Sequence, residues 1–140
     1  MGDLTDNLSR HEFECQCGCG TDFVDIALPG VLQACKQVFE VKYPLYNIGI
    51  NINSGTRCMF HNAKVGGKPE EAGRPMSGSM HLYGKAADFY LYDKDSGIHI
   101  NDDEVADYLE QRYTNTFGIG RYSGRTHVDT RKTQARWDKR

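Results

Sequence analysis

The sequence SMHLYGKAADFYLY, residues 79–92, decides the fold that we expect for this chain. From Lys85 to Tyr92 apolar residues recur at every second position, which is the pattern of a strand with one buried face. Gly84 allows a tight turn that brings His81 close to the beginning of this strand. The expected faces are Ala87, Phe89 and Leu91 on the buried side, and Ala86, Asp88, Tyr90 and Tyr92 on the other.

Apolar spacing predicts further helices and strands on both sides of this stretch. Apolar residues recur at three and four positions from Leu28 to about Lys42, which indicates a helix, and Ile48 to Ile52 alternate as a strand. Asn101–Asp103 can cap a second helix, and strands are expected at 118–121 and 125–130. Two helices and about four strands in this order favour an α+β fold, with the helices on one face of a small antiparallel sheet.

The other segments show no regular spacing of apolar residues. Residues 7–22 read as a loop with one helical turn at Ser9–Phe13, and Arg57–Met80 reads as a long loop of the kind that is functional or mobile. The basic residues around Trp137 could contact an anionic wall polymer, but a solvated, partly frayed terminus is the favoured interpretation. A chain of 140 residues suits one domain, residues 1–140, with a cysteine-rich entry segment (1–24) and a basic tail (131–140).

Three side chains are candidate metal ligands. His81 precedes the strand, Asp88 lies within it, and His127 lies within the last expected strand. Imidazole and carboxylate groups are the ligands of a catalytic zinc ion, which takes three protein groups and leaves one position for water. Two neighbouring strands of one sheet can present all three.

Several short motifs occur around these ligands, in a fixed order. They are SGTR (54–57), Asn62, VGG (65–67), SMHLYGKAAD (79–88), GIGRY (118–122) and HVD (127–129). Together they resemble the zinc D-Ala-D-Ala carboxypeptidase family, which includes vancomycin-resistance dipeptidases and many phage endolysins. The signature of that family is Ser-x-His-x-x-Gly-x-Ala-x-Asp, followed later by a histidine in a strand. The resemblance covers about residues 7–137, and the opening SRHEF (9–13) with CGCG (17–20) looks like a phage and prophage branch.

The resemblance implies a fold like that of the hedgehog and D-Ala-D-Ala peptidase domains, with one zinc ion on His81, Asp88 and His127. It also implies that the protein is a carboxypeptidase or endopeptidase that hydrolyses peptidoglycan stem or cross-link peptides. The specific expectation is a phage endolysin. Because the hedgehog signalling domain shows that this fold can lose activity, the alternative is a non-catalytic zinc-containing module that binds cell wall or belongs to a virion.

Three residues of these motifs are candidates for substrate binding: Arg57, Ser79 and Tyr122. A planar guanidinium at Arg57 can clamp a substrate carboxylate or polarise the scissile carbonyl, and a surface salt bridge is the alternative. Ser79 can orient a ligand or simply cap the turn before His81. Within the family, the position of Arg57 looks like a substrate-binding one.

The sequence pattern does not single out one residue that shuttles the proton. A zinc-bound water has a pKa of about 7, but a carboxylate must still carry its proton to the leaving amine. Many relatives have an acidic residue three positions before the strand histidine, and here that residue is Gly124. Asp129 lies two residues after His127, on the same strand face. It is the candidate catalytic base, or else it holds His127 or Arg57 in place.

The five cysteines are Cys15, Cys17, Cys19, Cys35 and Cys58. Their odd number and crowding do not suggest a disulfide framework and are typical of a reducing compartment. The first three together with Cys35 could bind a second, structural zinc ion. Closed zinc sites usually pair cysteines two to four residues apart, and alternate cysteines in a strand can serve packing alone. One catalytic ion without a second is therefore the favoured interpretation.

Net charge and hydropathy indicate which classes of binding partner are not expected. A formal net charge of -2 supplies no attraction to nucleic acid, and no apolar run approaches the roughly 20 residues of a membrane helix. The first residues, MGDLTD, lack the features of a signal peptide. We therefore expect a monomer made in the cytoplasm, with no nucleic-acid partner, which acts on the cell wall or periplasm after release.

Overall fold

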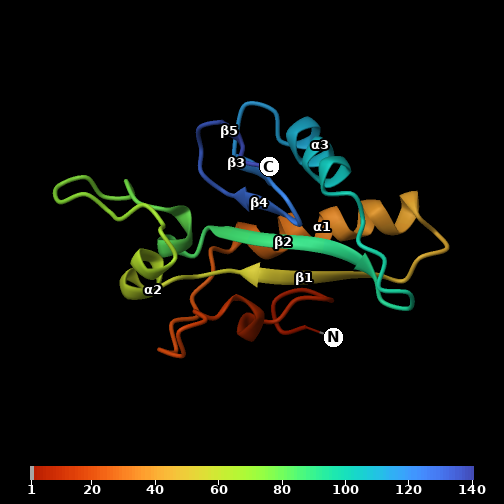
Figure 1. The fold of residues 1–140 in the computed structure, drawn as a ribbon, viewed down its shortest axis with the longest axis horizontal. Helices are drawn as coiled ribbons and strands as arrows, with labels where there is room; N and C mark the ends of the chain where they lie inside the picture. The colour runs from red at the N-terminus through yellow and green to blue at the C-terminus, as the bar shows by residue number, and fades with distance from the viewer. Residues whose placement is uncertain (1) are drawn as a thin grey trace.

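The computed structural model describes residues 2–140 as three α-helices, two 3-10 turns and five strands (Figure 1). No helix in these residues is both long enough and apolar enough to cross a bilayer. The helical elements are η1 (Arg10–Phe13), α1 (Ala27–Lys42), α2 (Met59–Lys64), η2 (Met80–Tyr83) and α3 (Asp102–Arg112). The strands are β1 (Ile48–Ser54), β2 (Ala86–Asp93), β3 (Gly118–Tyr122), β4 (Arg125–Asp129) and β5 (Ala135–Asp138).

The five strands form one sheet in the order β1-β2-β4-β3-β5. The first four are antiparallel to their neighbours, whereas β5 runs parallel to β3. α1 packs against β1 and β2, and α3 packs against β3 and β4, so both helices lie on one side of the sheet (Figure 1). The predicted α+β class is confirmed, and the sheet differs from the expected antiparallel one only by its fifth, parallel strand.

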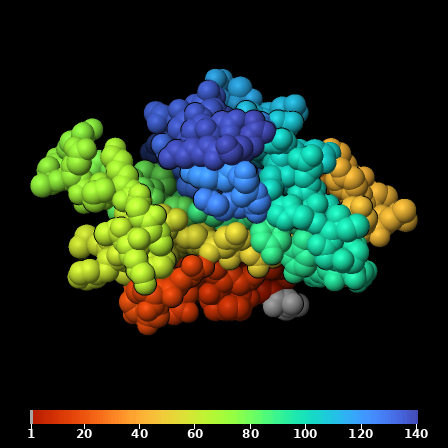
Figure 2. Space-filling model, viewed as in Figure 1, coloured from red at the N-terminus to blue at the C-terminus, as the bar shows by residue number. Residues whose placement is uncertain are grey.

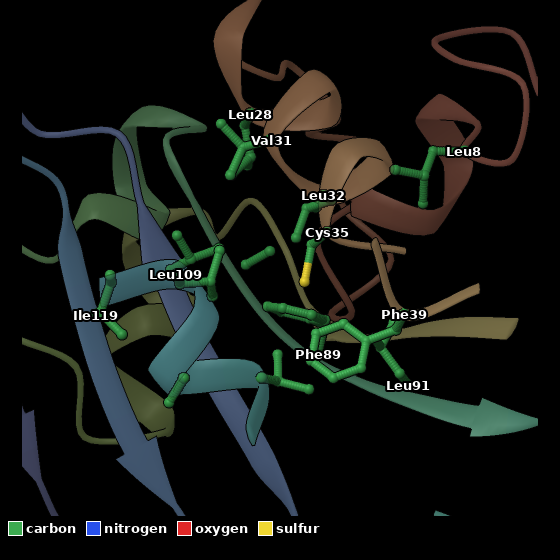
Figure 3. Packing of buried hydrophobic residues seen from close by; sticks show 14 of the residues in the cluster. Leu8, Leu28, Val31, Leu32, Cys35, Phe39, Phe89, Leu91, Leu109 and Ile119 are labelled. Carbon is green, nitrogen blue, oxygen red and sulfur yellow. The ribbon is translucent and has the colours of Figure 1, made fainter. Parts of the chain in front are cut away.

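The core lies between the sheet and the two long helices. Figure 3 shows Leu32 and Cys35 of α1 facing Phe89 of β2, and all three side chains are fully buried. Burial of each such leucine or phenylalanine contributes about 1.5–3 kcal/mol. Because Ala87, Phe89 and Leu91 all belong to this core, the alternate residues of β2 must face the other side of the sheet.

The other predicted elements occur close to their expected bounds. The helical turn at residues 9–13 is η1, and Asn101 caps α3 by accepting a hydrogen bond from the Asp103 amide at 2.8 Å. The expectation of a long loop from Arg57 to Met80 is wrong, because this stretch contains α2 and the beginning of η2. Its middle part, near residue 70, projects from the body in Figure 2.

The basic tail is not frayed as expected, since residues 135–138 form β5. The amide of Ala135 donates to the carbonyl of Phe117 at 3.0 Å. The guanidinium of Arg136 donates to the carbonyls of Tyr113, Thr116 and Phe117 at 2.7–3.1 Å. This strand is therefore held by backbone pairing with β3 and by the bonds of Arg136 to backbone carbonyls, and neither requires an alternating apolar pattern in the sequence.

Candidate metal centre

The three predicted ligands meet on the face of the sheet that is free of the long helices. Asp88 on β2 and His127 on β4 are direct partners across the antiparallel pair. Their neighbours Ala87 and Val128 are buried in the core, so Asp88 and His127 must point to the opposite face. His81 comes from η2, which ends at Gly84 with a left-handed φ of 66° and leads into β2.

The donor atoms of the three ligands lie close enough together to share one metal ion. Nε2 of His81 lies 3.4 Å from Oδ2 of Asp88, which is within the separation of about 3.3–3.6 Å between the ligand atoms of tetrahedral zinc. Nδ1 of His127 lies 2.9 Å from Oδ1 of Asp88, which is a hydrogen-bond distance. All three side chains are buried, and their donor atoms lie within 4.8 Å of one another.

The second nitrogen of each imidazole has a partner that selects the metal-binding tautomer. Nδ1 of His81 lies 2.6 Å from the carbonyl of Gly55, to which it can only donate, so Nε2 is free to bind a metal. Nε2 of His127 lies 2.7 Å from Oδ2 of Asp129, which leaves Nδ1 facing Asp88. Zinc-bound histidines almost always donate their other N–H to a carboxylate or carbonyl. The residues present therefore fit a zinc ion.

The pKa shifts of Asp88 and His81 suit a bound cation, whereas that of His127 favours its protonated form. Burial opposes ionisation of Asp88, but hydrogen bonds from His127 and His81 outweigh it and hold the pKa of Asp88 far below its ordinary value. Burial lowers the pKa of His81, which favours the neutral, ligating imidazole. Burial also acts to lower the pKa of His127, yet its hydrogen bonds to Asp129 and Asp88 raise it overall.

Asp129 is fully buried and uses both carboxylate oxygens within the protein. Besides His127, Oδ1 accepts from the Gly118 amide at 3.1 Å and from Nε of Arg131 at 2.7 Å, and Oδ2 accepts from Nη2 of Arg131 at 2.8 Å. Asp129 does not line the cleft described below. Of the roles left open by the sequence, these contacts favour holding His127; they include none to Arg57.

Trp137 on β5 is a residue of this site that the sequence did not predict. Its ring lies 4.9 Å from that of His127, and its Nε1 donates to the hydroxyl of Tyr122 at 2.9 Å. The indole occupies the space over Gly120, where an added Cβ would lie 2.3 Å from Nε1. Gly120 is the only feature of the sequence that reflects this packing.

We expect Gly120→Ala to displace Trp137 and to lower the free energy of unfolding by about 1–3 kcal/mol, the usual cost of overpacking. Because Trp137 is the only tryptophan of the chain, intrinsic fluorescence reports its displacement directly. Gly30→Ala in α1 is the control, since its Cβ would lie more than 4 Å from the other residues that the structure describes, apart from its own helix backbone and chain neighbours. Unchanged emission and stability in Gly120→Ala would contradict the packing described.

The metal-ligand cluster opens into a cleft of about 490 Å³. In Figure 2 a hollow lies between the projecting segment near residue 70 and the C-terminal residues. Five basic side chains line the cleft, whereas Asp88 is the only carboxylate among the described residues that does so. The basic residues are Arg57, Lys68, Arg125, Arg131 and Lys139.

The three predicted substrate-binding residues, Arg57, Ser79 and Tyr122, all line this cleft. The Arg57 side chain is only 14% exposed and lies 3.5 Å from Asp88, so it is not a surface salt bridge. Ser79 caps η2, with its hydroxyl accepting from the His81 amide at 3.3 Å. Gly124 lies in the turn between β3 and β4 with a left-handed φ of 84°, so no acidic group is available there.

Comparison with known proteins agrees with this geometry. No curated protein and no solved structure matches the chain. A family model described as Peptidase M15 matches residues 6–129, a range that includes His81, Asp88 and His127. The chain therefore belongs to the M15 family of zinc peptidases, as its resemblance to the D-Ala-D-Ala carboxypeptidases predicted.

Proposed function

We propose that this protein hydrolyses peptide bonds in the stem or cross-link peptides of peptidoglycan, as a phage endolysin does. Family membership supports a zinc peptidase, and the basic cleft supports the substrate class. Stem peptides carry free carboxylates, and five basic side chains around a single carboxylate favour an anionic peptide. The observation that carries the proposal is the buried His81–Asp88–His127 cluster in this basic cleft.

Within this proposal, the zinc ion supplies Lewis acidity and a water of lowered pKa. Arg57 binds the peptide. Its Nη contacts to Asn62 and Asp88 are 3.4 and 3.5 Å, so the guanidinium keeps donors for a substrate carboxylate or carbonyl oxygen. Asp129 acts as a positioning residue that fixes the ring of His127. Ser79 and Tyr122 contact the bound peptide from the cleft wall.

A second candidate is a zinc-containing module that binds cell wall, or is part of a virion, without cleaving peptides. The observation that favours it is the cleft itself: apart from Asp88, no described carboxylate lines it, and Gly124 replaces the usual acid. In that case the same basic residues would still bind anionic wall polymer.

Digestion of purified peptidoglycan by the zinc-loaded protein tests the proposal, with mass spectrometry of the muropeptides. We expect new products that disappear when a chelator removes the zinc. Loss of a terminal D-Ala identifies a carboxypeptidase, whereas conversion of cross-linked dimers to monomers identifies an endopeptidase. Unchanged muropeptides, together with co-sedimentation of the protein with the wall, would favour the binding module.

A further inference from the structure

Four of the five cysteines gather at one point, and none of them lines the cleft of the M15 site. The sulfur atoms of Cys15, Cys17, Cys19 and Cys58 lie within 4.8 Å of one another. Cys15 and Cys17 are 3.5 Å apart, and Cys17 and Cys58 are 3.6 Å apart. Cys35, expected from the sequence as the fourth member, lies instead in the hydrophobic core against β2 (Figure 3).

The backbone of this cluster is a series of turns, and not the strand in which alternate cysteines would serve packing. Gly18 and Gly20 adopt left-handed φ values of 84° and 86°, which glycine tolerates without strain. The amide of Cys15 donates to the carbonyl of Thr21 at 2.8 Å and closes the loop. The loop thereby directs three thiols to one centre. Cys17 and Cys19 are exposed, so burial in a core does not explain them.

We propose that Cys15, Cys17, Cys19 and Cys58 bind a second zinc ion in a closed, structural site. Tetrahedral zinc with Zn–S bonds of about 2.3 Å places its sulfur atoms about 3.8 Å apart, close to the two separations observed. A disulfide would require about 2.05 Å. Four thiolates complete the tetrahedron and leave no open position, so this ion has no direct part in catalysis.

Backbone amides around the cluster favour thiolate ligands. The amide of Cys58 donates to the sulfur of Cys15 at 3.4 Å, and the amide of His61 donates to the sulfur of Cys58 at 3.4 Å. Such N–H···S bonds orient ligating sulfurs and stabilise their negative charge. The beginning of α2 thus contributes both a candidate ligand, the thiol of Cys58, and a hydrogen-bond donor, the amide of His61.

The proposed ion links the entry segment to the catalytic cleft. Cys58 directly follows Arg57, and the same short segment contains Gly55, whose carbonyl orients His81. This segment already touches η1, where the Thr56 amide donates to the carbonyl of Phe13 at 2.8 Å. A metal bridge from residues 15–19 to Cys58 therefore fixes the segment that positions both Arg57 and His81.

Metal analysis of the full chain, purified under reducing conditions with zinc, tests this site independently of activity. We expect two zinc ions per chain in the wild type and one in Cys58→Ser or Cys17→Ser. The control Cys35→Ala, which removes a thiol outside the cluster, should keep two. His81→Ala should keep one. The melting temperature of Cys58→Ser should fall by about 5 °C or more, because structural zinc contributes folding energy.

Cobalt substitution separates the two sites spectroscopically. The sulfur-to-cobalt charge-transfer band should persist in His81→Ala and vanish in Cys58→Ser. If the cysteine variants do not fold, titration of the wild-type protein with a mercurial replaces them, and one zinc ion should be released as four thiols react. A single zinc ion per wild-type chain that Cys58→Ser retains, or disulfides among these cysteines after reducing purification, would overturn the proposal.

Discussion

His81→Ala should abolish zinc binding at the M15 site and lower the proposed hydrolysis of peptidoglycan by about 1000-fold or more. The variant keeps only Asp88 and His127 on adjacent strands, and two protein ligands do not hold a catalytic zinc that needs three. Polarisation by the metal supplies several kcal/mol of transition-state stabilisation, and each 1.4 kcal/mol or so is a factor of ten in rate.

Metal content, muropeptide release and thermal unfolding should be measured together for this variant. His11→Ala is the matched control, because His11 is exposed and lies outside the cleft. The lost hydrogen bond to Gly55 should cost only about 1–3 kcal/mol of stability, so the protein should remain folded while activity disappears. Activity within tenfold of the wild type in His81→Ala protein that has lost the zinc ion of the M15 site would refute the role assigned to this metal.

The ligands could be predicted from the sequence because each lies in a motif that resembles the D-Ala-D-Ala carboxypeptidase family, and the local apolar pattern is consistent with the face on which each lies. The alternation of Ala87, Phe89 and Leu91 assigns one face of β2 to the core, and Asp88 must then lie on the other. The same reasoning applies to His127 beside Val128 on β4. Gly84 provides the left-handed residue that ends η2, so its presence already indicated a turn between His81 and the strand.

The remaining features depend on contacts between distant segments, which no local pattern reveals. Cys58 joins cysteines about 40 residues earlier in the chain only because α2 begins beside the entry loop. Trp137 reaches His127 because β5 pairs with β3, and that pairing rests on Arg136 and backbone carbonyls. Neither arrangement requires a regular spacing of apolar residues, so neither leaves a local pattern in the sequence.

Asp129→Asn distinguishes the two roles that the sequence left open for this carboxylate. As a positioning residue, Asp129 holds Nε2 of His127 and is itself held by Arg131 and the Gly118 amide. Loss of such a partner typically weakens metal affinity 10–100-fold. We therefore expect weaker zinc binding in Asp129→Asn and substantial recovery of hydrolysis when zinc is supplied in excess.

If Asp129 were instead the general base, Asp129→Asn would show the opposite result. Zinc affinity would stay near that of the wild type, and the turnover number would fall by about 10²–10⁴-fold even at saturating zinc, since proton transfer contributes that much. Asp138→Asn is the control, because Asp138 is exposed and, among residues 2–140, forms a salt bridge only with Arg140 at the surface. Zinc titrations by calorimetry, with rates measured at each zinc concentration, decide between the roles. The buried carboxylate, with both oxygens already bonded, leads us to expect the loss in affinity.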